Sequence, residues 1–162
     1  MDKKSILFVC LGNICRSPAA EAVFLHLIKI KKLEKSFEVD SAGTGSWHVG
    51  KKADSRMRDA ASRRGIDINS IARQITVEDF KKFELIITMD TSNYQDVIHL
   101  SHGYKGESIA EIKPMLSFST SSDLKDVPDP YYGGCEGFDN VLDMLEDACS
   151  ELINQLSGER KD

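Results

Sequence analysis

A cysteine and an arginine near the amino end of the chain have the spacing of a phosphate-binding loop. Cys10 is separated from Arg16 by five residues, and a hydroxyl residue, Ser17, follows directly. An arginine guanidinium can hold two phosphate oxygens at once, and backbone N–H groups at the start of a helix favour the thiolate form of a cysteine. A thiolate beside a bound phosphate ester can attack phosphorus and form a cysteinyl-phosphate without a metal ion.

The residues on either side of this loop predict the elements that position it. Residues 5–9 form a short apolar run, which is typical of a central parallel strand buried on both faces. Ser17 is expected to cap the following helix, with Pro18 at its first position and Glu21 in its first turn. Gly12 and Asn13 can supply positive φ angles for a tight turn. The loop residues expected to bind phosphate are Leu11, Gly12, Asn13, Ile14, Cys15 and Ser17.

A second group of residues, most of them far along the chain, could supply the proton donor and the walls that contact the substrate. Asp129 lies between two prolines, and a protonated carboxyl opposite the thiolate could protonate the leaving oxygen. Tyr131, Tyr132 and Trp47 could form the apolar walls of a cleft around an aryl ring. Walls of that depth favour phosphotyrosine over the shorter phosphoserine. Without the cysteine loop, Asp129 would be interpreted as a turn residue and the tyrosines as exposed aromatics.

The other sulfur and imidazole groups have less specific roles. Cys15 is close enough in sequence to Cys10 to form a reversible disulfide with it, and the alternative is a small packing residue. Cys149 falls on the apolar stripe of the last predicted helix and is expected in the core. His99 and His102 lack partner ligands at the spacing of a zinc site. No metal ion and no cofactor are therefore expected.

The pattern of apolar runs and turn residues predicts an α/β protein. Strands alternating with helices imply a four-stranded parallel twisted sheet flanked by helices, a flavodoxin-like or Rossmann-like open sandwich, in one domain covering residues 1–162. The phosphate loop would follow the first strand, at the carboxyl edge of the sheet. The predicted strands are residues 5–9, 37–41 and 84–89, with a fourth within 108–116; the predicted helices start near residues 17, 54, 76, 91 and 138.

Composition limits the partners of the protein. The 162 residues carry a net charge of -5, so no overall field attracts nucleic acid or anionic lipid. The cationic residues between Lys29 and Lys35 end a predicted helix, where cations offset the helix dipole, and are interpreted as a solvated face. No signal peptide or membrane span is visible. A cytoplasmic monomer is expected.

The loop sequence resembles the signature of the low-molecular-weight protein tyrosine phosphatases, and the similarity continues along the chain in the same order and spacing. The matching residues are Val9-Cys10-Leu11-Gly12-Asn13-Ile14-Cys15-Arg16-Ser17-Pro18, Asp40-Ser41-Ala42-Gly43-Thr44, Trp47, Ala53-Asp54-Ser55-Arg56, Ala72-Arg73-Gln74, Met89-Asp90, Ser92-Asn93 and Asp129-Pro130-Tyr131-Tyr132-Gly133.

This resemblance implies a role for each matching residue. It implies that Cys10 is the nucleophile, Arg16 the phosphate clamp and Asp129 the general acid. It also implies that Ser17 is a hydroxyl partner of the thiolate, and that Asn13 and Ser41 support the strained backbone of the loop. In the family a histidine commonly joins this support just before the Ala-Arg-Gln stretch, whereas this chain has Ser70-Ile71 there.

The predicted function is hydrolysis of phosphotyrosine and small aryl phosphates, with phosphate and vanadate as inhibitors. Three alternatives are weighed against it. Arsenate reductases resemble the fold but need two further cysteines after the third strand, and residues 85–105 contain none. Phosphoarginine phosphatases resemble the signature but have threonine where Ile14 stands. A catalytically silent phosphopeptide-binding module could dispense with Cys10 or Asp129, and both are present.

Overall fold

The computed structural model describes residues 3–120, 123–130 and 134–158. Within these ranges no helix is both long and apolar enough to cross a membrane. The elements are β1 (Lys4–Cys10), α1 (Arg16–Ile30), a 3-10 turn (Glu34–Ser36), β2 (Phe37–Gly43), α2 (Ser55–Ser62), α3 (Asp79–Lys82), β3 (Leu85–Thr88), α4 (Thr91–His102), β4 (Glu111–Pro114), a second 3-10 turn (Met115–Phe118) and α5 (Cys135–Ser157).

The four strands form one parallel sheet in the order β2-β1-β3-β4, which confirms the predicted architecture. β1 pairs with both β2 and β3, so Ile6 lies opposite Val39 on one side and Leu85 on the other. The chain therefore moves to one side of β1 and then to the other. The carboxyl end of β1 is the topological switch point at which ligands bind in such sheets.

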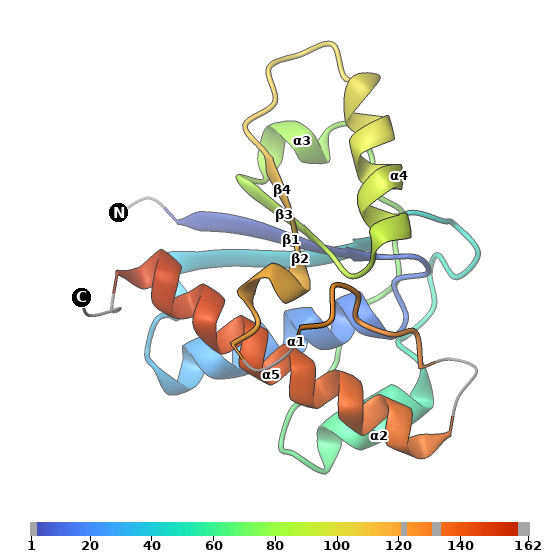
Figure 1. Ribbon diagram of the computed structural model, residues 1–162, viewed down its shortest axis with the longest axis vertical. Coiled ribbons are helices and arrows are strands. Elements are labelled where there is room, and N and C mark those ends of the chain that lie inside the picture. Colours follow the sequence, from blue (N-terminus) through green and yellow to red (C-terminus); the bar gives the residue numbers. More distant parts are fainter. Residues whose placement is uncertain (1–2, 121–122, 131–133, 159–162) are drawn as a thin grey trace.

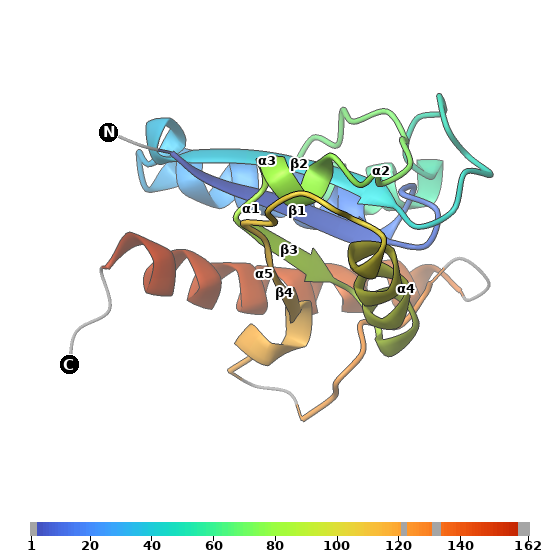
Figure 2. The same cartoon turned by 90° about the horizontal axis from the view of Figure 1, so that it is seen from above.

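Successive residues of β1 face two separate cores because side chains alternate across a strand. Ile6 and Phe8 pack with residues of α1, α2 and α5, while Leu7 and Val9 pack with residues of α3 and α4. Figure 1 shows α1, α2 and α5 below the sheet and α3 and α4 above it. The loops that follow β1 and β2 lie at the same end of the molecule, on the right in Figures 1 and 2.

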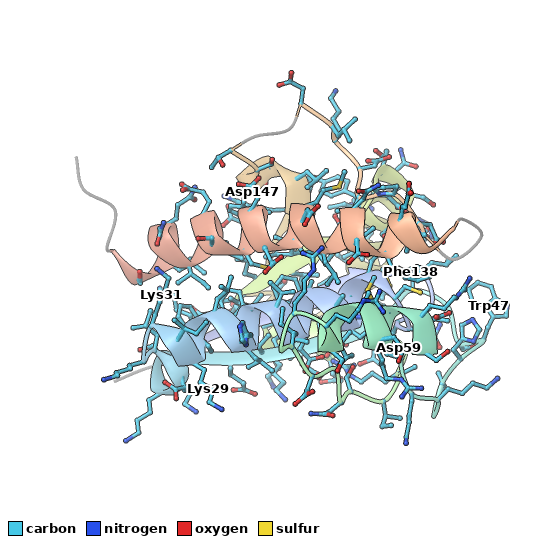
Figure 3. The ribbon with its side chains drawn as sticks, turned by 90° about the horizontal axis from the view of Figure 1, so that it is seen from below. Lys29, Lys31, Trp47, Asp59, Phe138 and Asp147 are labelled. Atoms are coloured by element: carbon cyan, nitrogen blue, oxygen red, sulfur yellow. The ribbon has the colours of Figure 1, made fainter. Side chains whose placement is uncertain are left out.

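The last helix, α5, covers α1 and α2 with the predicted apolar stripe. Phe138 and Cys149 are fully or almost fully buried, which confirms Cys149 as a core residue. Figure 3 shows Phe138 between α5 and α2, where the Arg56 guanidinium lies 4.8 Å from the centre of its ring. Lys29 and Lys31 are exposed at the opposite end from Trp47, as expected for a solvated face.

The start of α1 differs from the prediction. The helix begins at Arg16, and its cap position, Cys15, makes no side-chain cap hydrogen bond. Ser17 is not the cap because its hydroxyl is fully buried and is hydrogen-bonded towards Cys10. Gly12 does not adopt a positive φ angle, and Asn13 alone supplies it in this loop, at 58°.

Candidate active site

The loop between β1 and α1 is held in a tight curve by its neighbours. The carbonyl groups of Cys10 and Leu11 accept hydrogen bonds from the N–H groups of Thr44 and Gly45, both at 2.9 Å. Asn13 turns the chain with its positive φ angle, which asparagine tolerates better than most residues. The curve places the loop around the amino end of α1, where N–H groups converge.

Close contact between the loop and β2 depends on a missing side chain. Gly43, the last residue of β2, is paired with Cys10 in the sheet. A Cβ atom on Gly43 would lie 2.7 Å from the carbonyl oxygen of Leu11 and 3.0 Å from the backbone nitrogen of Asn13. Both contacts are with loop backbone, and the Leu11 carbonyl is already held by the Gly45 N–H group, so β2 can support the loop at this distance only with glycine.

Cys10 lies at the base of a cavity of about 90 Å³ that also contains Arg16 and Asp129. Its sulfur is 3.0 Å from the Ser17 hydroxyl oxygen and accepts a hydrogen bond from the Asn13 N–H group at 3.3 Å. The residue is 2% exposed, so the Asn13 N–H group and the Ser17 hydroxyl take the place of water around the sulfur.

Asn13 organises the polar groups behind the loop. Its Oδ1 atom accepts a hydrogen bond from the Arg73 N–H group at 2.9 Å, which orients the amide. Its Nδ2 group therefore faces and donates to the hydroxyl oxygens of Ser17 at 2.8 Å and Ser41 at 3.0 Å. Because Ser17 accepts from Asn13, its own proton is directed to the Cys10 sulfur or to the Ala42 carbonyl, 3.2 Å away.

Arg16 is 3% exposed and already oriented for an anion. Its Nη1 atom donates to the Asp90 carboxylate at 2.6 Å and to the Val127 carbonyl at 3.1 Å, and its Nη2 atom lies 3.7 Å from Asp129. Burial alone would lower the pKa of Arg16, but the charges of Cys10 and the two aspartates outweigh it, and the net change is upward. The guanidinium therefore remains charged beside the cavity.

Asp129 is carried by a segment with two anchors. The N–H group of Val127 donates to the Met89 carbonyl at 2.7 Å. The Asp126 carboxylate accepts from both the N–H and the hydroxyl group of Thr91, each at 2.9 Å. These bonds attach the segment to the carboxyl end of β3 and the start of α4. They hold the half-exposed Asp129 carboxyl at the mouth of the cavity.

One wall of the cavity comes from the loop after β2. Trp47 is 69% exposed, and its ring lies directly against Gly45, where a Cβ atom would overlap it. Trp47 and His48 both line the cavity, and Figure 3 shows Trp47 at the edge of the molecule. Tyr131 and Tyr132, the other predicted wall residues, lie outside the described residues.

Cys15 differs from Cys10 in its surroundings. Burial is the largest cause that raises the pKa of the Cys15 thiol far above its usual range, and the nearby Asp54 carboxylate raises it further. Cys15 therefore keeps its proton. Both cysteines are free thiols in this structure.

The structure brings most of the predicted site residues to one place. Cys10, Leu11, Gly12, Ile14, Cys15, Arg16, Trp47 and Asp129 line the cavity. Asn13, Ser17 and Ser41 lie behind it and are buried. The hydroxyl oxygen of Ser70 is buried and finds no hydrogen-bond partner among the described residues, so it does not take over a supporting role in the network.

Sequence reasoning missed three contributors. His48 lines the cavity, Asp90 fixes Arg16, and Glu21 receives a hydrogen bond from Ser41. The sequence signals were the adjacency of His48 to Trp47 and, for Asp90, its place at a strand end and in the matching Met89-Asp90 pair. The contact of Glu21 had no local signal, because its partner belongs to another element.

Comparison with known proteins extends the similarity to the whole chain. A model of the family described as low molecular weight phosphotyrosine protein phosphatase matches residues 5–162. The low molecular weight protein-tyrosine-phosphatase YfkJ of Bacillus subtilis is 40% identical over 158 residues, covering 97% of this chain and 98% of YfkJ. A crystal structure of a protein tyrosine phosphatase from Entamoeba histolytica superposes with a TM-score of 0.88 at 46% identity, covering 98% and 100% of the two chains. The Drosophila arginine phosphatase superposes with a TM-score of 0.87 at 31% identity, covering 97% and 98%.

Proposed function

The chain belongs to the low molecular weight phosphotyrosine protein phosphatase family, and we propose that it hydrolyses phosphotyrosine in proteins through a cysteinyl-phosphate on Cys10. The observation that carries this proposal is the cavity in which the Cys10 sulfur, the Arg16 guanidinium and the Asp129 carboxyl meet. These are a nucleophile, a clamp for an anion and a proton donor, which together are sufficient for the reaction.

In the first step the Cys10 thiolate attacks phosphorus, and an S–P bond forms as the P–O bond to the substrate breaks. Asp129 gives its proton to the leaving oxygen, so a neutral phenol departs. Arg16 and the loop N–H groups bind the non-bridging oxygens and offset the charge that develops on them. The Ser17 hydroxyl, 3.0 Å from the sulfur, stabilises the thiolate before attack and again when it leaves.

In the second step a water molecule attacks the phosphorus of the cysteinyl-phosphate. The Asp129 carboxylate accepts the proton of this water, the S–P bond breaks, and inorganic phosphate and the Cys10 thiolate are released. The cycle returns each group to its starting state without an external oxidant or reductant. It needs neither a metal ion nor a cofactor.

The rim of the cavity supports an aryl substrate. Trp47 and Leu11 are 69% and 41% exposed, so both can contact a ring that enters above the phosphate. We propose that Tyr131 and Tyr132 complete these walls. The apolar Ile14 side chain lines the same cavity and offers no hydrogen bond to a guanidinium, which favours phosphotyrosine over phosphoarginine.

Several further expectations belong to this proposal. The protein acts as a cytoplasmic, single-domain monomer on phosphoproteins, without nucleic acid or membrane partners, and phosphate and vanadate inhibit it. When a peroxide oxidises Cys10 to the sulfenic acid, the Cys15 thiol condenses with it to a disulfide and releases water. This reaction would protect the nucleophile from irreversible oxidation.

The test is turnover of a phosphotyrosine peptide and of p-nitrophenyl phosphate in the presence of a chelator. We expect turnover with both, inhibition by vanadate, and a phosphorylated cysteine in acid-quenched enzyme by mass spectrometry. Cys10→Ser should bind the phosphopeptide without turning it over. Loss of activity with chelator would refute the metal-independent mechanism, and a strong preference for a phosphoarginine peptide would refute the assigned substrate.

A further inference from the structure

A chain of hydrogen bonds connects Cys10 with a buried carboxyl group on α1. From the Cys10 sulfur the chain passes through Ser17, Asn13 and Ser41. It ends at Glu21, whose Oε1 atom accepts a hydrogen bond from the Ser41 hydroxyl at 2.6 Å. Glu21 does not line the cavity, so its hydrogen-bonded connection to Cys10 runs through Ser41 and Asn13.

The direction of these bonds is determined by the Asn13 amide. The Arg73 N–H group occupies Asn13 Oδ1, so the Nδ2 group donates to Ser41. Ser41 has one hydroxyl proton, and because its oxygen accepts from Asn13 the proton goes to Glu21. A carboxylate has only acceptor sites and fits this end of the chain. Ionised Glu21 thus makes a charge-assisted hydrogen bond, the stronger kind.

Among the described residues, no lysine or arginine forms an ion pair with Glu21. Arg73 is the cation that lowers the pKa of Glu21, and its guanidinium is already bound to Asp79 at 3.0 and 3.1 Å and to Asp40 at 3.1 Å. A cavity of about 220 Å³ adjoins Glu21, and the charged residue that shares its lining is another acid, Asp67. Burial is the largest influence and raises the pKa of Glu21 to about 7, and Asp40 raises it too, while the bond from Ser41 and the charge of Arg73 oppose them.

We propose that Glu21 is a positioning residue for the phosphate loop: its carboxylate, through Ser41, holds Asn13 in the conformation that keeps the Cys10 sulfur in place. Two features of Asn13 make this coupling direct. Its N–H group donates to the sulfur, and its positive φ angle is an uncommon conformation that needs support from its surroundings. When Glu21 gains a proton, the bond from Ser41 becomes a weaker, neutral one, and Asn13 is held less firmly. The inference rests on the proposed function and adds a pH response to it.

The test compares the wild type with Glu21→Gln, which keeps the size and the acceptor oxygen but cannot ionise. The ratio of the kcat/KM values of variant and wild type, measured on p-nitrophenyl phosphate from about pH 5 to about pH 9, cancels ionisations that the two enzymes share. We expect this ratio to be close to one at low pH and to fall about fivefold as the pH rises through about 7. The fall should appear in kcat, because the sulfur and not the binding rim is displaced. Glu34→Gln, at an exposed carboxylate on the 3-10 turn before β2, is the control and should give a flat ratio.

The results of these measurements distinguish an error in the positioning role of Glu21 from an error in the proposed function. A flat ratio for Glu21→Gln would refute the positioning role, and a ratio that rises with pH would show that the charge of Glu21 only repels the substrate. Absence of turnover in the wild type would refute the proposed function instead. If the variant fails to fold, heteronuclear NMR of the wild type gives a second test: the side-chain amide signals of Asn13 should move with a midpoint near pH 7, and signals that stay fixed would overturn the inference.

Discussion

Replacing Glu21 by glutamine should make the protein more stable above neutral pH. The pKa of Glu21 is raised from its ordinary value of 4.5 to about 7, chiefly by burial. A folded-state pKa above the unfolded value means that the folded protein binds the proton more tightly. The stability that Glu21 contributes is therefore complete below about pH 4.5 and is lost as the pH rises through about 7.

The size of this effect follows from the same values. A change of one pKa unit corresponds to about 1.4 kcal/mol, so the full displacement would amount to about 3 kcal/mol. Glu21 keeps some exposure to water, and part of the change lies below pH 5, so a smaller part is measurable. We expect the free energy of unfolding of the wild type, relative to Glu21→Gln, to fall by about 2 kcal/mol between pH 5 and pH 8.

Urea unfolding followed by circular dichroism at several pH values measures this difference directly. Glu34→Gln is again the control, and it should give a curve parallel to that of the wild type because Glu34 is exposed. Parallel curves for Glu21→Gln and the wild type would refute the reasoning, since they would mean that Glu21 titrates alike in the folded and unfolded chains. A wild type that gains stability relative to the variant as pH rises would give the wrong sign and refute it as well.

Three other substitutions test the site. Gly43→Ala would place a Cβ atom 2.7 Å from the Leu11 carbonyl oxygen, so kcat/KM for p-nitrophenyl phosphate should fall at least about tenfold, and unchanged kinetics would contradict the close contact. Arg16→Lys loses the planar fork next to Asp90, and its affinity for vanadate, measured by inhibition, should fall about a hundredfold; near wild-type inhibition would contradict the clamp. Asp129→Asn cannot donate its proton, so kcat should fall by about 10² or more for phenyl phosphate and much less for p-nitrophenyl phosphate; equal losses would contradict the proton donor.

Local patterns were sufficient to predict the elements that form the site. The apolar run at residues 5–9 became the central strand β1, and the interval from Cys10 to Arg16 became the loop between strand and helix. Both predictions depend only on residues that are close together in the sequence, because a short apolar run indicates a buried strand and the spacing of two residues gives the length of a loop. Asp54 and Asp90 cap the helices that were predicted to start near residues 54 and 91, and each cap bond joins residues two or three positions apart.

Contacts between distant segments could not be predicted in this way. Asp90 binds Arg16 across 74 residues, and Ser41 binds Glu21 across 20. Ser17 has the right type and place for a helix cap, but the competing acceptor and donor, Cys10 and Asn13, are brought to its hydroxyl by the folded loop. The choice of Asn13 over Gly12 for the positive φ angle depends likewise on where the Asn13 side chain binds.

The two measurements on Glu21→Gln are most informative together. If Glu21 were only structural, the variant would lose stability and activity alike. If the negative charge of Glu21 acted only by repelling the Cys10 thiolate and the substrate phosphate, the Glu21→Gln variant would keep the loop intact. Its activity would then be higher than that of the wild type. The third case is a carboxylate that is buried at a cost to stability and also holds Asn13 through Ser41. Above about pH 7 the Glu21→Gln variant should then be more stable than the wild type and have a lower kcat. Because burial causes the first change and the hydrogen bond causes the second, the stability difference should develop between about pH 4.5 and about pH 7, the kcat difference should develop around pH 7, and the two should have opposite signs.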